Sequence, residues 1–186
     1  MIIISNDTVY LKKEFTQETY DQALIRVDMK GLECDCGSNG KLVKIGYYQR
    51  YYKTSTRKIC IQIQRVMCKH CGRTHALFVE CMVPSSMLLV TTQIELLRSY
   101  YNHRLEEFLM VYPTIERSNA FYVVKNYEKK WSKILKLTGL SLMDEEKKII
   151  KVFIKHWVIV EQVLQRCALV RAGIKHCELR RGEPVP

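Results

Sequence analysis

Two pairs of cysteines, each followed at once by a glycine, are the side chains in this sequence best suited to bind a metal ion. Cys34 and Cys36 stand in CDCG, and Cys68 and Cys71 stand in CKHCG. A gap of two residues lets a tight turn direct both thiolates at one ion, and the glycine permits the positive φ that such a turn often needs. The two pairs therefore predict a zinc ribbon, in which four thiolates hold a structural Zn2+ in a closed tetrahedral site.

The first pair departs from the usual spacing, because only Asp35 separates its two cysteines. His70 or His75 could therefore replace Cys34 as a ligand, and Cys60 could approach the site from the intervening hairpin. The cysteines outside the two pairs are interpreted as ordinary buried thiols: Cys60, Cys81, Cys167 and Cys177.

Two other kinds of chemistry compete with structural zinc at Cys68 and Cys71. Dithiol exchange also uses a two-residue gap, and Lys69 and His70 would lower a thiol pKa. Thioredoxin-like sites, however, open a helix after a strand, whereas this pair follows a hairpin and has a second pair to match it. Catalytic zinc needs an open coordination position, and four thiolates leave none. We therefore predict no enzyme activity.

Apolar periodicity and turn residues predict an α+β protein in four parts. Residues 1–32 are predicted to form a packing element with a short strand and a helix over about 16–27. Residues 33–84 form the zinc ribbon, with strands over 41–53 and 57–67, because Ile59, Ile61 and Ile63 alternate with polar side chains. Residues 85–140 form a helix-turn-helix part with helices over 92–101, 104–111 and from about 114. Residues 141–186 form a C-terminal helix, over about 144–172, and a tail.

The helix predicted from residue 114 has an apolar face and a basic face. Its apolar stripe recurs at steps of three and four residues: Ala120, Val124, Tyr127, Trp131 and Leu135. The opposite face carries Tyr122, Lys125, Lys129, Lys133 and Lys136. Two short helices before such a helix are typical of a helix-turn-helix with its recognition helix last. Asn119 and Asn126 could contact base edges there, while the lysines contact phosphates.

The charge balance favours a polyanionic partner, since 30 Lys and Arg oppose 19 Asp and Glu for a net charge of +11. No acidic residue lies between Asp35 and Glu80. Tyrosines at 47, 48, 51 and 52 interleave with the basic residues there and could stack on bases or contact sugars. In the ribbon, the predicted nucleic-acid contacts are Lys44, Arg50, Lys53, Arg57, Lys58, Arg65 and Arg73.

Hydropathy predicts a cytoplasmic protein without a membrane partner. No run of about 18 apolar residues occurs, and the opening MIII is too short for a signal peptide. Eight cysteines in a reducing compartment favour metal binding and burial over a disulfide framework. The last predicted helix carries a long apolar stripe, which would pack on the domain or pair with a second copy as a homodimer.

The cysteine motifs and the tri-helical stretch after them resemble a family of bacterial zinc-ribbon proteins of mobile elements, found mainly in Firmicutes. These proteins are similar to the N-terminal parts of transposases. The likeness is closest over residues 33–84 and most specific over residues 68–77, CKHCGRTHAL. It implies DNA binding through a zinc ribbon and a helix-turn-helix. We call each turn that carries a cysteine pair a knuckle. In the family, the first knuckle usually has two residues between its cysteines, whereas this chain has one.

These patterns favour a non-catalytic DNA-binding protein, serving a transposon or phage as an accessory or regulatory factor. A full transposase needs a metal-binding carboxylate triad on an RNase H-like fold, and the chain's five aspartates do not match one. Two other functions remain open. The chain could be a protein adaptor for a transposase or a polymerase, or an RNA-binding module that uses its tyrosine-rich hairpin.

Overall fold

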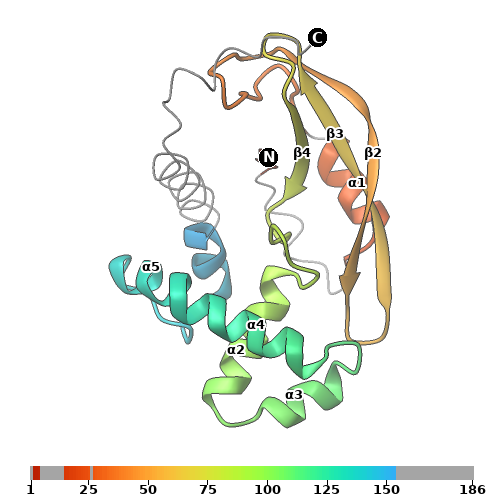
Figure 1. Ribbon diagram of the computed structural model, residues 1–186. Coiled ribbons are helices and arrows are strands. Elements are labelled where there is room, and N and C mark those ends of the chain that lie inside the picture. Colours follow the sequence, from red (N-terminus) through yellow and green to blue (C-terminus); the bar gives the residue numbers. More distant parts are fainter. Residues whose placement is uncertain (1, 5–14, 26, 154–186) are drawn as a thin grey trace, which may run out of the picture.

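The computed structural model describes residues 2–4, 15–25 and 27–153 and has the α+β architecture predicted from the sequence (Figure 1). A long hairpin of β2 (Leu42–Lys53) and β3 (Lys58–Cys68) runs along one side of the molecule, with α1 (Gln17–Ile25) against it. The helices that follow gather at the end of the hairpin where the chain turns. The predicted helix 144–172 is described only in part, as helical residues 146–153, and the rest lies outside the described residues.

The sheet contains two strands besides the hairpin, of which the sequence patterns predicted one. β4 (Thr74–Val79) pairs antiparallel with β3, and β1 (Ile2–Ile4) pairs parallel with β4, so the strand order is β1-β4-β3-β2. The expected short strand near the start of the chain is thus present, but its partner β4 was not expected. β4 was missed because its six residues directly follow the second knuckle and lack clean polar alternation.

The hydroxyl of Tyr20 joins β3 to β4 where their ladder ends. The last paired residues are Arg65 and Ala76. One step further, the Tyr20 hydroxyl accepts a hydrogen bond from the backbone N–H of Gln64 and donates one to the carbonyl of Leu77, both at 2.9 Å. Burial raises the pKa of Tyr20, which keeps the phenol neutral and able to donate. Helix α1 therefore supplies the hydrogen bonds that the separating strands no longer give each other.

The Tyr20→Phe substitution should lower the free energy of unfolding by about 3 kcal/mol, because it leaves two buried backbone groups without partners. Urea unfolding followed by circular dichroism measures the change. Tyr47→Phe is the matched control, since Tyr47 is 59% exposed. Equal stability of the two variants would contradict the role given to the Tyr20 hydroxyl.

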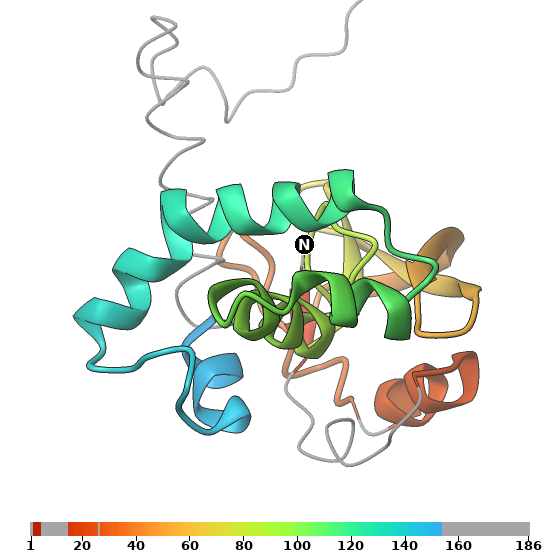
Figure 2. The ribbon, with the colours of Figure 1, turned by 90° about the horizontal axis from the view of Figure 1, so that it is seen from below.

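The helical part contains α2 (Val90–Tyr101), α3 (Leu105–Val111) and then a continuous helical run. This run comprises α4 (Arg117–Asn126), the π-helical turn η2 (Tyr127–Trp131) and α5 (Ser132–Leu137). Figure 2 shows the run lying alongside α2 and α3 and bending along its length, as π turns often cause. Within the described residues, no helix is both long enough and apolar enough to cross a membrane.

The sheet and the helices share one hydrophobic core across the boundary predicted at Pro84. One cluster of buried side chains joins Tyr52 and Ile63 of the hairpin to Leu97 of α2 and Trp131 of η2. A smaller cluster at the cysteine end includes Ile4, Leu42, Val66 and Leu77, together with Cys34 and Cys68. The hairpin therefore packs against the cysteine-containing cluster at one end and against the helices at the other.

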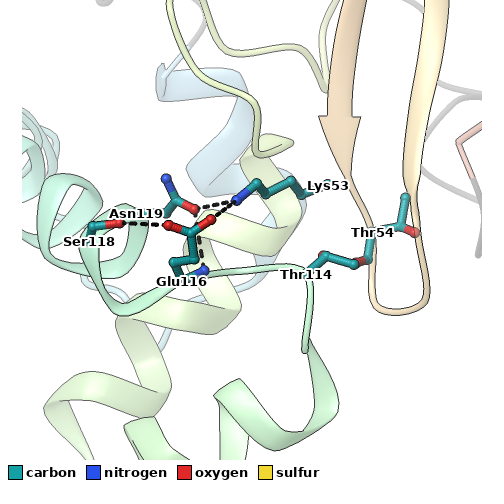
Figure 3. A network of polar contacts seen from close by, with 6 residues as sticks. All are labelled: Lys53, Thr54, Thr114, Glu116, Ser118 and Asn119. Atoms are coloured by element: carbon teal, nitrogen blue, oxygen red, sulfur yellow. Dashed lines mark hydrogen bonds and ion pairs between the residues drawn. The ribbon is translucent and has the colours of Figure 1, made fainter.

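Polar contacts tie the turn of the hairpin to the start of α4 (Figure 3). The Lys53 ammonium donates to Asn119 Oδ1 at 2.7 Å and to Glu116 Oε1 at 3.3 Å. The Thr114 hydroxyl donates to the backbone carbonyl of Thr54. Glu116 and Asn119 also form the capping box of α4. The same side chains that begin the helix thus fix it against the hairpin.

Candidate metal centre and basic surface

Both cysteine knuckles are tight turns closed by the glycine that follows the second cysteine. In the first knuckle Gly37 N–H donates to the carbonyl of Cys34, and in the second Gly72 N–H donates to that of Cys68, both at 2.8 Å. The φ angles of Gly37 and Gly72 are +81° and +71°, which confirms the predicted need for glycine. The first turn comprises the four residues 34–37 and the second the five residues 68–72. The first knuckle has one residue fewer between its cysteines than the second, and its turn is therefore one residue shorter.

The four thiols converge at one point between the knuckles. The Sγ atoms of Cys34, Cys36, Cys68 and Cys71 all lie within 4.8 Å of one another. Cys34 Sγ is 3.6 Å from Cys71 Sγ, and Cys36 Sγ is 3.9 Å from Cys68 Sγ. Zn–S bonds of about 2.3 Å in a tetrahedron place the sulfur atoms about 3.8 Å apart. The cluster is thus consistent with a bound metal ion such as zinc.

The alternative ligands lie around this cluster. His75 Nε2 is 3.2 Å from Cys34 Sγ, and His75 Nδ1 is 3.9 Å from a carboxylate oxygen of Asp35. His75 therefore lies beside Cys34, where its Nε2–H tautomer would donate to the thiolate, as residues around metal ligands often do. His70 Nδ1 is 3.8 Å from Cys36 Sγ, on the exposed side.

Two of the cysteines interpreted as buried thiols lie within the described residues. Cys81 is buried, as predicted, but Cys60 is exposed. The prediction for Cys60 was wrong because it follows Ile59 on a strand whose buried positions include Ile61 and Ile63, so alternation turns Cys60 to solvent. Cys60 is outside the four-thiol cluster.

Burial and hydrogen bonding separate the acidities of the thiols. Burial raises the pKa of Cys34 to about 12, whereas the Ser38 hydroxyl lowers the pKa of Cys36 to about 5. Ser38 Oγ lies 3.1 Å from both Cys36 Sγ and Cys68 Sγ, and it also lowers the pKa of Cys68. Sequence reasoning missed Ser38. The sequence feature that could have identified it is its hydroxyl side chain, which follows Cys36 by two residues.

Zinc affinity should rise with pH between 5 and 8, because metal binding must displace the Cys34 proton throughout this range. Cys36, whose pKa is lowered to about 5, contributes such a proton only near the acid end of this range. The Ser38→Ala substitution should raise the Cys36 pKa and weaken zinc binding about 10-fold, most strongly at acid pH. Competition with a chromophoric chelator measures both effects. Thr56→Ala, in the exposed hairpin turn, is the control, and an affinity independent of pH would contradict the assignment.

Five of the predicted basic contacts in the ribbon are exposed: Lys44, Arg57, Lys58, Arg65 and Arg73. Lys58 also packs over the exposed ring of Tyr51, with Nζ 4.6 Å from the ring centroid. Two others make internal contacts. Arg50 donates to the carbonyls of Val83 and Ser86, at 2.8 and 2.9 Å, and Lys53 holds the start of α4. The cationic groups of Arg50 and Lys53 are therefore occupied by contacts within the chain.

The run from α4 to α5 presents the basic face that its sequence predicted. Lys125, Lys129 and Lys133 are exposed, Tyr122 is 54% exposed, and Asn126 is half-buried. The predicted apolar stripe is buried at Ala120, Val124, Trp131 and Leu135, and Val123 joins it. Asn119 instead accepts the Lys53 hydrogen bond.

We name the exposed cations among the predicted nucleic-acid contacts the basic surface. Its members are Lys44, Arg57, Lys58, Arg65, Arg73, Lys125, Lys129 and Lys133.

Comparison with known proteins gives one partial match. The sequence profile of a family described as Domain of unknown function (DUF6431) matches residues 34–106. No curated protein and no solved structure matches the chain. The matched segment begins at Cys34, contains all four cysteines of the cluster and extends through α2 into α3. Over less than half of its length, the chain is thus similar to this family, and the similar part contains the whole candidate metal centre.

Proposed function

We propose that this chain is a non-catalytic, zinc-containing DNA-binding protein that serves a mobile element as an accessory or regulatory factor. In this proposal the zinc is structural, because four thiolates complete a tetrahedral shell and leave no position for a substrate. The mobile-element role rests on the resemblance of the cysteine motifs and of the helices after them. DNA binding rests on the basic surface and on the order of the helices.

The observation that carries the proposal is that two basic elements are fixed to each other. Hydrogen bonds from Lys53 and Thr114 join the hairpin to the start of α4. The exposed lysines of the run from α4 to α5 therefore hold a set position relative to those of the hairpin. In a helix-turn-helix, the last helix enters the major groove, and its lysines contact phosphates while polar side chains contact bases.

Binding to a duplex should depend steeply on salt. If about six members of the basic surface neutralise phosphates, affinity should fall about 10³-fold between 50 and 200 mM salt. Fluorescence anisotropy with a labelled duplex of random sequence measures this slope. Binding that does not respond to salt, or no binding at 50 mM, would contradict the proposal and favour the protein adaptor.

RNA binding is a second candidate because tyrosine rings are exposed on the hairpin. Tyr47 is 59% exposed and Tyr51 is 43% exposed, and exposed rings on a basic strand pair can stack with unpaired bases. Competition of a labelled duplex with unlabelled single-stranded RNA separates the candidates. Displacement of the duplex by a lower concentration of RNA than of duplex DNA would favour RNA.

A further inference from the structure

A pocket of about 160 Å³ lies between the segment after β4 and the run from α4 to η2. Its apolar lining includes Val83, Leu97 and Trp131. Its polar lining includes Asn126 and Lys130 from the helical run. The pocket thus opens beside the predicted recognition helix and combines an apolar interior with a polar, basic edge.

The wall formed by residues 83–86 is held in place by side chains from two other elements. Arg50 donates to the carbonyls of Val83 and Ser86, and its guanidinium lies 4.8 Å from the ring centroid of Phe78. Gln93 of α2 donates to Ser86 Oγ at 3.0 Å and to the carbonyl of Leu88 at 2.9 Å. The pocket is therefore preformed, and a ligand would not have to order this wall.

The size and lining of the pocket suit one aromatic ring with hydrogen-bonding groups at its edge. A cavity of about 150 Å³ is known to accept benzene. The side-chain amide of Asn126 makes no hydrogen bond to any described residue and offers both a donor and an acceptor. Tyr122, which is 54% exposed, lies at the same pocket. Lys130 also lines this pocket.

We propose that this pocket binds one unpaired nucleobase, with Asn126 hydrogen-bonded to the base edge and the ring held among the apolar side chains. The inference rests on the proposed nucleic-acid binding and adds to it a preference for sites with an unpaired base. Taking a base out of a duplex stack costs a few kcal/mol, and that cost is smallest for a base that is already unpaired.

The test compares three DNA duplexes with the same flanks: fully paired, with one extra thymidine, and with one extra abasic nucleotide. The abasic duplex has a similar bend but offers no base. The wild type should bind the thymidine duplex about 10-fold more tightly than the abasic one, as expected for one polar contact and ring burial. Asn126→Leu should reduce this ratio to about one, because the leucine side chain cannot hydrogen-bond the base edge. Lys125→Ala should weaken all three complexes and keep the ratio.

A wild-type ratio of one, with salt-dependent binding intact, would overturn the pocket and leave the proposed function standing. Loss of binding to every duplex would overturn the proposed function first.

A second measurement does not depend on duplex binding. The chain has two tryptophans, so in a Trp157→Phe variant the fluorescence reports Trp131. Thymidine monophosphate should quench it and ribose phosphate should not. Quenching by N-acetyltyrosinamide and not by the nucleotide would overturn the inference in favour of a protein side chain.

Discussion

The Cys68→Ser protein is expected to lose its metal ion and to unfold at the cysteine end of the hairpin. Cys68 is fully buried among the hydrophobic side chains of that end. A structural zinc ion contributes on the order of 10 kcal/mol of apparent folding free energy, which is comparable to the whole stability of a typical domain. Removing zinc from the wild type with a strong chelator should have the same effect, because both changes abolish the same four-thiolate site.

Zinc content by metal analysis and thermal unfolding by circular dichroism together test this expectation. Cys60→Ser is the matched control, because it makes the same chemical change at an exposed thiol outside the cluster. It should keep one zinc per chain and the wild-type melting temperature. If the Cys68→Ser protein kept its zinc and its melting curve, the ribbon assignment would be wrong.

Replacing Lys125, Lys129 and Lys133 together by Ala should lower affinity for duplex DNA roughly 50-fold at 100 mM salt, because three phosphate contacts are lost. The slope of log affinity against log salt should fall by about 2.7. The fold should be retained, since all three side chains are exposed and Ala favours helix. Anisotropy titrations at several salt concentrations measure both quantities.

The control for these lysines removes the same charge elsewhere. Lys147, Lys148 and Lys151 are exposed on the helical segment 146–153, and their replacement by Ala gives the same net charge as the first triple variant. It should change the affinity by less than about five-fold, since long-range charge effects are screened. Equal weakening by both triple variants would show that net charge alone drives binding and would contradict a specific role for the run from α4 to α5.

The four-cysteine cluster was predictable because its signal is local. The two Cys-Gly knuckles specify their own turns through hydrogen bonds between residues only three or four positions apart. The alternating isoleucines of β3 likewise specify the hairpin that lies between the two knuckles. The observed bounds of both its strands lie within one residue of the predicted bounds. Asp35 alone between the first cysteines left the role of Cys34 open. The answer needed the backbone, which shortens the turn and still brings Cys34 Sγ to 3.6 Å from Cys71 Sγ.

The contacts that are distant in sequence could not be predicted. No pattern near Arg50 indicates that its guanidinium would bind the carbonyls of Val83 and Ser86. Lys53 was expected to contact nucleic acid, and its partners Glu116 and Asn119 are more than 60 residues away. The pairing of β4 with β1 depends in the same way on the whole fold. A basic residue in a strand gives no local sign of whether it faces solvent or another element.

The length of the hairpin has a geometric consequence for any duplex that lies along it. β2 has 12 residues, and at about 3.3 Å per residue it spans about 36 Å between Leu42, at the cysteine end, and Lys53, whose side chain contacts the start of α4. One turn of B-DNA also rises about 34–36 Å. The two ends would therefore meet the same side of the double helix one turn apart. The length of the hairpin would therefore match one turn of DNA. Adding or removing pairs of residues, one in each strand of the hairpin, would place its two ends on different sides of the double helix.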